Sequence, residues 1–382
     1  MSLSLAYVQE ALLITATDDM ITNAATVGIN AGIVGALNTP ENLSHAKMTR
    51  LANNNGSGHI REVRIATKQR LTPSDNEDLE MDGCDFGDEI PYIEETVSIT
   101  KQSAVSFTIA EETIRRFPEV VSQLVTLTGA KSANQIVMKA RQSAAGMDLL
   151  RVIREMAGDF LLSYDALIQK INIQLLTDFV ALQGAWQGGD ATKSYEVQYA
   201  NGFATGGGAI NAGGLFQFKQ DARNNMFPGT PHVIVDPHGA MDRIYQSDSR
   251  YFGQGANGIN YSSVRGDLGQ IARIFPDQNI ADVVGDVDDA LIFMPGSANF
   301  LPWLKYVGSY GDIGIMDRFT LPIPQVPNLD VDVKILPDEC EEIYKVKMGL
   351  HYELYIPTLE LFKSTDYLYG VNGTFPAAFT QA

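Results

Sequence analysis

The sequence predicts an α+β fold, in which one long helix stands apart from several groups of strands. A stretch near the middle of the chain has apolar residues at helical spacing, and segments on both sides of it alternate apolar with polar residues, as strands do. Of the 382 residues, 45% are hydrophobic, which is enough for one large or two to three small packed units.

The first 55 residues are expected to form an N-terminal arm with some helix. As far as residue 38, the charged side chains are those of Glu10, Asp18 and Asp19, among many Ala, Ile, Leu and Thr residues. An extension with so little charge is more stable against a neighbouring surface than in water. We therefore expect the arm to lie on such a surface.

The chain carries no recognisable signal for export. Gln9 and Glu10 interrupt the apolar run at its start, where a signal peptide needs a basic region followed by uninterrupted apolar residues. No window approaches the ~20 apolar residues that span a bilayer. Cys84 and Cys340 stand apart, without a CxxC partner. We expect free thiols in a reducing cytoplasm and no membrane partner.

Two strands are expected on either side of a strongly acidic segment. Residues from His59 to Leu71 and from Thr96 to Ile109 alternate apolar with polar side chains. Between them, Thr72 to Glu95 holds ten carboxylates and no basic residue. The pattern predicts a long, polar, two-stranded hairpin. An isolated hairpin is marginally stable in water, so this one must dock on something.

The strongest pattern predicts one long helix from Met147 to Leu182, followed by the glycines of residues 184–189. Apolar and aromatic residues recur there at a mean spacing of about 3.7 residues, close to the helical period. At about 1.5 Å per residue such a helix is ~54 Å long, and we interpret it as a strut. The predicted apolar stripe comprises Leu149, Ile153, Met156, Phe160, Tyr164, Leu167, Ile171, Leu175, Phe179 and Leu182.

Shorter elements follow the helix. His232 to Val235 and Ala290 to Met294 are predicted to be buried strands, with a short helix between them from Gly239 to Gln246. From Leu329 to Phe362 the alternation of apolar and polar residues returns. This last region predicts a closing set of strands.

The acidic segment holds the nearest match to a metal motif. Asp78, Glu80, Asp82 and Glu89 have the spacing of an EF-hand calcium loop. The third position carries glutamate where Asp or Asn is expected, Asp85 takes a place that is usually apolar, and the flanks are strand-like instead of helical. We therefore expect a solvated acidic arm and no tight calcium site.

The remaining motifs predict neither a cofactor nor an enzyme. Gly253, Gly255 and Gly258 have the spacing of a dinucleotide fingerprint, but the residues before them are polar where a buried strand is required. The five histidines form no HxH or HExxH pair, and there is no GxSxG elbow for a serine nucleophile. We assign no catalytic residue and no cofactor.

The charge balance excludes a class of partners. The net charge is −18, whereas a protein that reads nucleic acid presents a basic face to the phosphates. A container that must fill with nucleic acid and release it is compatible with an acidic chain. The charged fraction of 19% lies below the roughly 25% that is typical, which indicates surface hidden in subunit contacts.

The order of these elements resembles that of the tailed-bacteriophage major capsid proteins of the Hong Kong 97 type. These proteins combine an N-terminal arm, an extended hairpin called the E-loop, a long spine helix, an axial domain and a peripheral domain. The corresponding ranges here are 1–55 for the arm, 56–118 for the E-loop, 119–228 for the spine helix and first part of the peripheral domain, 229–326 for the axial domain, and 327–382 for the closing strands of the peripheral domain.

The resemblance implies a structural subunit that assembles with itself, as pentamers and hexamers, into an icosahedral shell around double-stranded DNA. Hairpins and arms would lie across neighbouring subunits. Further implied partners are a separate scaffolding protein, a portal and the packaged DNA, bound without sequence specificity. The location would be the virion capsid, after assembly in the host cytoplasm. Some relatives link a hairpin lysine covalently to an asparagine of another subunit, and Lys68 or Lys101 would be the positions here.

Two other functions remain open at the level of sequence. An encapsulin-type bacterial compartment shares the fold but encloses enzymes, and the chain length and long acidic hairpin favour a virus over it. An extracellular calcium-binding surface or adhesion protein would explain the acidity and the motif around Asp78, but the start of the sequence does not favour export. Electron microscopy of purified protein distinguishes a shell from both a monomer and an enzyme.

Overall fold

The chain forms two compact units whose segments interleave along the sequence. In the computed structural model the described residues are 31–39, 47–50, 62–68, 92–110, 144–186, 232–236, 272–284, 290–293, 298–304, 318–323, 326, 328–338, 343–356 and 377–380. Unit 1 consists of residues 1–31, 101–171 and 302–352, and unit 2 consists of residues 32–100, 172–301 and 353–382.

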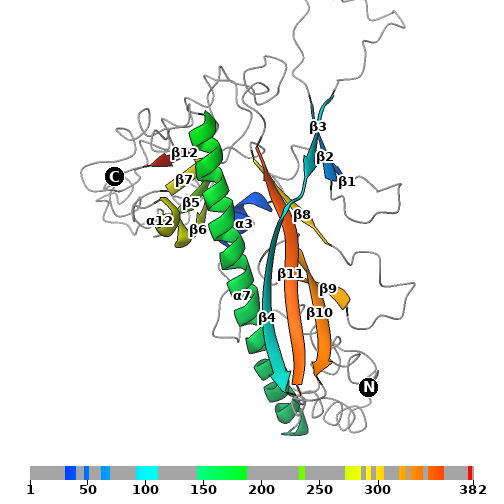
Figure 1. Ribbon diagram of the computed structural model, residues 1–382. Coiled ribbons are helices and arrows are strands. Elements are labelled where there is room, and N and C mark those ends of the chain that lie inside the picture. Colours follow the sequence, from blue (N-terminus) through cyan, green and yellow to red (C-terminus); the bar gives the residue numbers. More distant parts are fainter. Residues whose placement is uncertain are drawn as a thin grey trace, which may run out of the picture. The chain divides into compact units, whose positions relative to one another are not determined.

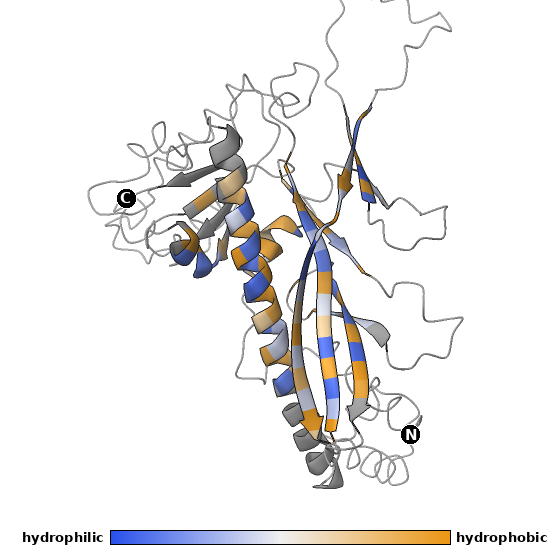
Figure 2. Cartoon of the chain, viewed as in Figure 1, coloured by the Kyte–Doolittle hydropathy of each residue, from blue (hydrophilic) through white to orange (hydrophobic). Residues whose placement is uncertain are grey.

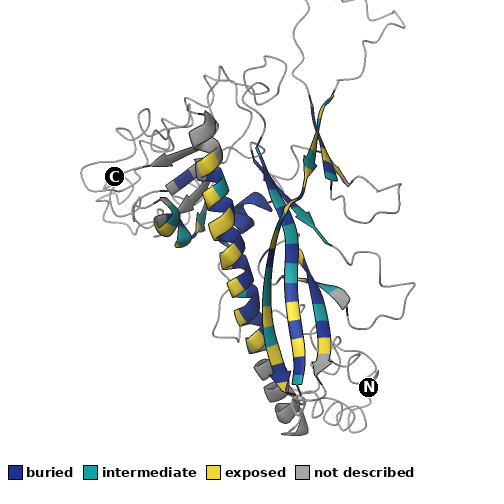
Figure 3. Ribbon diagram, in the orientation of Figure 1, coloured by how far each residue is buried: buried dark blue, intermediate teal, exposed yellow. Residues whose placement is uncertain are grey.

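The predicted long helix is present as α7, Ala144–Trp186, with 43 residues. It extends beyond the predicted bounds at both ends. The helix is amphipathic, and buried and exposed residues alternate around it in Figure 3. Leu162 and Ile173 lie on its exposed side. The predicted stripe is buried at every position whose side chain is described: Phe160, Tyr164, Leu167, Ile171, Leu175 and Phe179.

Unit 1 is built on an antiparallel sheet with the strand order β4-β11-β10-β9. The strands are β4 (Lys101–Ala110), β11 (Ile343–Tyr355), β10 (Asp330–Asp338) and β9 (Arg318–Pro322), and β8 (Asn299–Trp303) also pairs with β11. Figure 2 shows hydrophobic and hydrophilic residues alternating along β11. The closing strands expected after Leu329 are therefore confirmed as β10 and β11, while residues 357–362 lie outside the described ranges.

One face of this sheet packs against α7. The rings of Phe107 on β4 and Phe160 on α7 meet edge to face, with centroids 4.8 Å apart, and Tyr164 continues the contact 6.2 Å from Phe160. Figure 1 shows α7 running beside β4 and β11 over this stretch. The residues of β11 that share the packed face are all buried: Tyr344, Val346, Met348, Leu350 and Tyr352.

The predicted pairing of the hairpin strands is wrong in one respect. The segment predicted as one strand from Thr96 to Ile109 is two strands, β3 (Tyr92–Ser98) and β4, which belong to different sheets. The break follows from Thr100, whose backbone N–H and hydroxyl both donate to the Glu353 carboxylate, at 3.1 and 2.8 Å. A side chain thus takes the donor that a continuous ladder would use.

The hairpin itself forms as expected between β2 (Glu62–Lys68) and β3, which are antiparallel. A third strand, β1 (Lys47–Arg50), pairs with the other edge of β2, so the sheet has three strands and not two. Val63 and Ile65 of β2 are buried, whereas β3 has no fully buried residue. The acidic residues between β2 and β3 lie outside the described ranges.

A second sheet in unit 2 has the order β12-β7-β5-β6. The predicted strands are confirmed as β5 (His232–Asp236) and β7 (Ala290–Phe293), with β6 (Ala272–Pro276) parallel to β5 and β12 (Ala377–Thr380) antiparallel to β7. Phe179 of α7 and Phe293 of β7 contact each other with ring centroids 6.0 Å apart. The expected helix from Gly239 to Gln246 lies outside the described residues.

The described residues of unit 2 also include two short helices, α3 (Gly32–Leu37) and α12 (Asn279–Val284). Every residue of α3 is buried, and its first N–H groups bond to Asp277 and Asn172 of the same chain. In the described part of the chain, no helix has the length and apolarity needed to cross a bilayer.

Replacing Ile171 with Asp should prevent folding of the subunit. Ile171 is fully buried, so the substitution places a charge without a partner inside the core, at a cost on the order of 4 kcal/mol. Such a loss is a large part of the stability of a typical domain. We expect insoluble protein on expression, measured as the soluble fraction.

The same substitution at Ile173, which is 43% exposed on the same helix, serves as the control and should remain soluble. Soluble, folded Ile171→Asp protein would show that this side of α7 does not need to be buried.

Candidate functional site

The residues with EF-hand-like spacing, Asp78, Glu80, Asp82 and Glu89, lie outside the described part of the chain. So do the glycines of the dinucleotide-like motif. Within the described ranges, no three His, Cys, Asp or Glu side chains are placed to hold a metal ion. Of the two candidate cross-linking lysines, Lys68 ends β2 and Lys101 begins β4.

The outward face of the unit 1 sheet is the first candidate site. Strand residues alternate between faces, so those that do not pack on α7 project from the opposite side. The register places Lys334 of β10 directly across from Lys347 of β11, and Leu336 across from Lys345. Lys345 and Lys347 are exposed and Lys334 is half-buried. Three lysines therefore gather on one small surface of an acidic protein.

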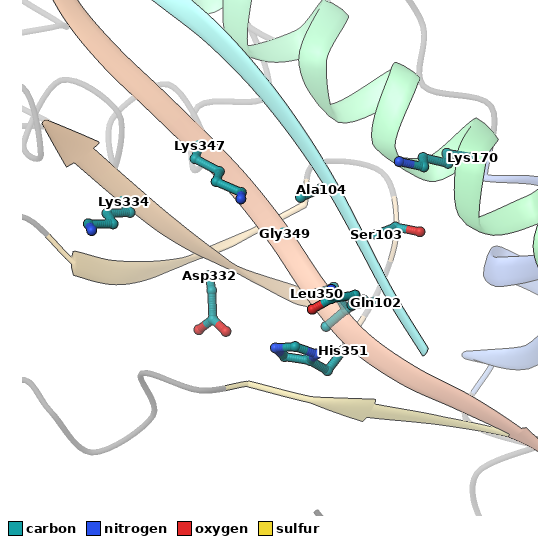
Figure 4. A pocket seen from close by; sticks show the side chains of 10 residues that line it. All are labelled: Gln102, Ser103, Ala104, Lys170, Asp332, Lys334, Lys347, Gly349, Leu350 and His351. Atoms are coloured by element: carbon teal, nitrogen blue, oxygen red, sulfur yellow. The ribbon is translucent and has the colours of Figure 1, made fainter. Parts of the chain in front are cut away.

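A hollow lies beside these lysines, with a volume of about 440 Å³ (Figure 4). Its floor is formed where Gly349 pairs with Ala104 and with Asp332 on the neighbouring strands. A Cβ on Gly349 would lie 3.0 Å from the Ser103 carbonyl oxygen and 3.2 Å from the Ala104 Cβ, so a side chain there would push β4 away. The hollow is lined by Gln102, Ser103, Ala104, Lys170, Asp332, Lys334, Lys347, Gly349, Leu350 and His351.

A second depression, of about 410 Å³, adjoins the first and shares Lys334 and Lys347 with it. Leu336, Lys345 and Ser106 also line it. Leu336 is 43% exposed, which is unusual for a large apolar side chain. The combined surface offers cationic groups, an apolar side chain and concave space, which is the chemistry of a docking surface and not of a reaction site.

A buried polar junction in unit 2 is the second notable site. At the N-terminus of α3, the N–H of Ile33 donates to the Asp277 carboxylate at 3.0 Å, and the N–H of Val34 donates to the Asn172 side-chain oxygen at 3.1 Å. Both acceptors are fully buried. These two residues satisfy donors that a helix leaves unpaired at its start.

Gly32 makes the close approach of these groups possible. Its φ is +48°, and a Cβ there would lie 2.2 Å from the Asp277 Oδ2 atom and 2.6 Å from the Asn172 Nδ2 atom. Only glycine adopts this conformation at low cost and leaves room for both side chains.

Burial raises the pKa of the Asp277 carboxyl above its ordinary value of 3.8. Hydrogen bonds from the Ile33 N–H, and from the N–H and side-chain amide of Asn279, act in the opposite direction and favour the charged form. Desolvation is the larger effect. The junction therefore holds a carboxylate that is costly to keep charged.

Sequence reasoning missed both sites. Lys345 and Lys347 alternate with apolar residues in the sequence. That Lys347 lies directly across from Lys334 depends on a strand register that the sequence does not specify. Asp277 stands two residues before α12 and accepts the Asn279 N–H, a capping pattern that could have been recognised. Its contact with Ile33, 244 residues away, could not.

No protein-family model and no curated protein matches the chain. Solved structures similar to it include the capsid of Ralstonia phage GP4, at 12% identity and a TM-score of 0.39 over 84% of this chain and 83% of that one. The cyanophage A-1(L) capsid asymmetric unit has 9% identity and a TM-score of 0.38, over 94% of each chain. The holo-SrpI encapsulin complex of Synechococcus elongatus PCC 7942 has 9% identity and a TM-score of 0.31, over 95% of this chain and 94% of that one.

The structures similar to this chain are thus phage capsids, with an encapsulin among them.

Replacing Gly32 with Ala should destabilise unit 2. The methyl group would occupy the space of the Asp277 and Asn172 side chains and would require a left-handed backbone, for a combined loss of about 3 kcal/mol. The control is Gly158→Ala in α7, where a Cβ meets no atom within 4 Å and a gain of roughly 0.5 to 1 kcal/mol is expected. Thermal unfolding of both variants measures the difference, and equal melting temperatures would argue against a tight junction.

The stability contributed by Asp277 should decrease as the pH rises. A carboxyl whose pKa is raised by folding binds its proton more tightly in the folded protein, so its contribution is complete below pH 3.8 and is lost as the pH rises through the folded value. We expect the advantage of the wild type over Asp277→Asn, measured by denaturant unfolding, to be larger near pH 4 than near pH 7. A difference that grows with pH would contradict the buried, desolvated carboxyl.

Proposed function

We propose that this chain is the major capsid protein of a tailed bacteriophage. In this proposal it is a structural subunit that assembles as pentamers and hexamers into an icosahedral shell around double-stranded DNA, with the virion capsid as its location and the host cytoplasm as its place of assembly. The observation that carries the proposal is the β2–β3 hairpin, in which every side chain of β3 is at least partly exposed and the sequence between the strands is long and acidic.

The contacts of the hairpin support this interpretation. All side chains of β3 are at least partly exposed, including Tyr92 at 48%. The ion pair between Arg64 and Glu94, at 3.2 Å, joins two side chains that are each about half exposed, and exposed pairs of this kind contribute little to stability. Tyr355 donates a hydrogen bond to Glu95 in the middle of β3. A strand whose side chains are this exposed is suited to contacts with other subunits.

The 43-residue helix α7 supports the same proposal. It supplies buried residues to both units, from Phe160 to Ile171 in unit 1 and from Asn172 to Phe179 in unit 2. A long continuous helix of this kind suits a subunit that bears mechanical load in a shell. The proposed parts keep the ranges given above: arm 1–55, E-loop 56–118, spine and first peripheral segment 119–228, axial domain 229–326, and closing peripheral strands 327–382.

The proposed partners are other copies of the chain, a scaffolding protein, a portal and packaged DNA. The net charge of −18 favours contact with DNA that is weak and independent of sequence. We assign the chain no catalytic role, no cofactor and no tight calcium site at Asp78, Glu80, Asp82 and Glu89. Negative-stain electron microscopy of concentrated protein, with and without a scaffold, should show rings, tubes or shells, and a monodisperse monomer under all conditions would contradict the proposal.

Replacing residues 72–90 with a short Gly-Ser turn should separate folding from assembly. The change leaves β2 and β3 intact and alters the closure entropy of the connection by only ~1 kcal/mol, so the subunit should melt at nearly the same temperature. Every subunit in a shell would lose an intersubunit contact, so closed particles should disappear.

Melting curves of the isolated subunit and microscopy of the assembly reaction are both needed for this variant. Normal shells from the shortened protein would show that the hairpin is not an intersubunit element. Failure to fold would show that residues 72–90 belong to the core.

A further inference from the structure

We propose that the outward lysine face of unit 1, formed by Lys334, Lys345 and Lys347, binds the acidic segment of residues 72–91 from a second copy of the chain. The inference rests on the proposed function, because assembly is what brings the copies together. The proposal names both the surface and the segment that binds it. The experiments below test this pairing separately from shell formation.

The first argument is the arrangement of like charges. Lys334 and Lys347 are directly opposed on adjacent antiparallel strands, and Lys345 lies two residues further along β11 on the same face. Side chains in such positions are close enough to interact, and like charges placed there repel each other. Among the described residues, neither Lys334 nor Lys347 has an ion-pair partner. Repulsion of this kind is relieved when an anionic group binds between the lysines.

The second argument is the shape and polarity of the surface. Gly349 and Ala104 leave a hollow next to Lys347, and Leu336 exposes an apolar side chain beside Lys345. Figure 4 shows Lys347 extending over β11 toward Gly349, with Lys334 on the neighbouring strand. A matching partner therefore carries negative charges together with a few apolar side chains.

The segment 72–91 has this composition. It contains eight carboxylates and no lysine or arginine, and Leu79, Met81 and Phe86 lie among its acids. Each copy of the chain supplies one such segment and one lysine face, so the two are always present in equal number. Charge complementarity selects the pairing and orients it, while each exposed contact remains weak and sensitive to salt.

Nucleic acid is a less suitable occupant. The chain has a net charge of −18, which repels a polyanion at long range. The three lysines form a small surface, on which a short peptide can place a few carboxylates, whereas a duplex presents phosphates along its whole length to an acidic protein.

Zero-length carbodiimide cross-linking of mixed isotopic protein tests the pairing directly. Equal amounts of ¹⁴N and ¹⁵N protein are assembled at low salt, cross-linked between amines and carboxylates, digested and analysed by mass spectrometry. We expect peptides of residues 72–91 joined to Lys334, Lys345 or Lys347, about half of them pairing one isotope with the other. Cross-links found only within one isotope would place the segment on its own subunit and overturn the proposal.

The same experiment distinguishes this inference from the proposed function. Mixed-isotope cross-links without closed particles would support the docking and overturn the shell. Closed particles without these cross-links would overturn the docking and leave the shell standing. The absence of both would overturn both.

Charge variants of the lysine pair provide the second test. In Lys334→Gln/Lys347→Gln the repulsion is gone, so the subunit should melt at the wild-type temperature or slightly above it. The salt concentration at which assembly is half complete should fall at least threefold. The control Lys334→Arg/Lys347→Arg keeps both charges and should assemble like the wild type. Unchanged salt dependence in the glutamine variant would overturn the proposal.

A duplex-binding assay covers the competing occupant. A fluorescent 30-base-pair DNA at the same low salt should bind the wild type and the glutamine variant equally weakly. Tight binding of the duplex that is lost in the glutamine variant and kept in the arginine variant would assign the lysines to DNA and overturn the peptide partner.

Discussion

The burial of one side of α7 is the constraint on which the rest of the structure depends. The rotation of this helix about its own axis is fixed in unit 1 by contacts such as Phe107 with Phe160, and in unit 2 by contacts such as Phe179 with Phe293. Burial, together with the charge of Asp330, raises the pKa of Tyr164 and keeps its hydroxyl neutral. The unit 1 sheet then presents its opposite face away from the helix, which leaves the lysine face available for contacts.

The strand β11 shows how one sequence pattern serves two purposes. Its even-numbered residues, from Tyr344 to Tyr352, are buried, while Lys345 and Lys347 project outward. A slip of one residue would exchange the two sets, so the register must be strongly fixed. The close approach of Gly349 to the Ser103 carbonyl contributes to this, because no other residue of β11 would fit there without moving β4. Core packing and surface chemistry are therefore determined together.

The elements that sequence predicted well are those whose pattern is local. The stripe of α7 follows from a spacing of three or four residues, and the buried strands β5 and β7 from short apolar runs. Prediction failed where a distant group intervenes. Thr100 interrupts a strand because Glu353, 253 residues away, takes its backbone donor. The pairing of Lys334 with Lys347 depends on the strand register, and the contact between Asp277 and Ile33 depends on the tertiary fold. No local sequence pattern specifies either. The EF-hand-like residues around Asp78 lie outside the described residues, so the expectation that they form no tight calcium site stays a prediction.

The junction at α3 also sets an order of events during synthesis. Ile33 leaves the ribosome early, but its acceptor on Asp277 follows 244 residues later and the Asn172 acceptor of Val34 follows after 138. At roughly 5 to 20 residues per second, the start of α3 waits on the order of 10 to 50 seconds for the Asp277 acceptor. During that interval the apolar residues of α3 lack this partner, and a chaperone has time to bind them.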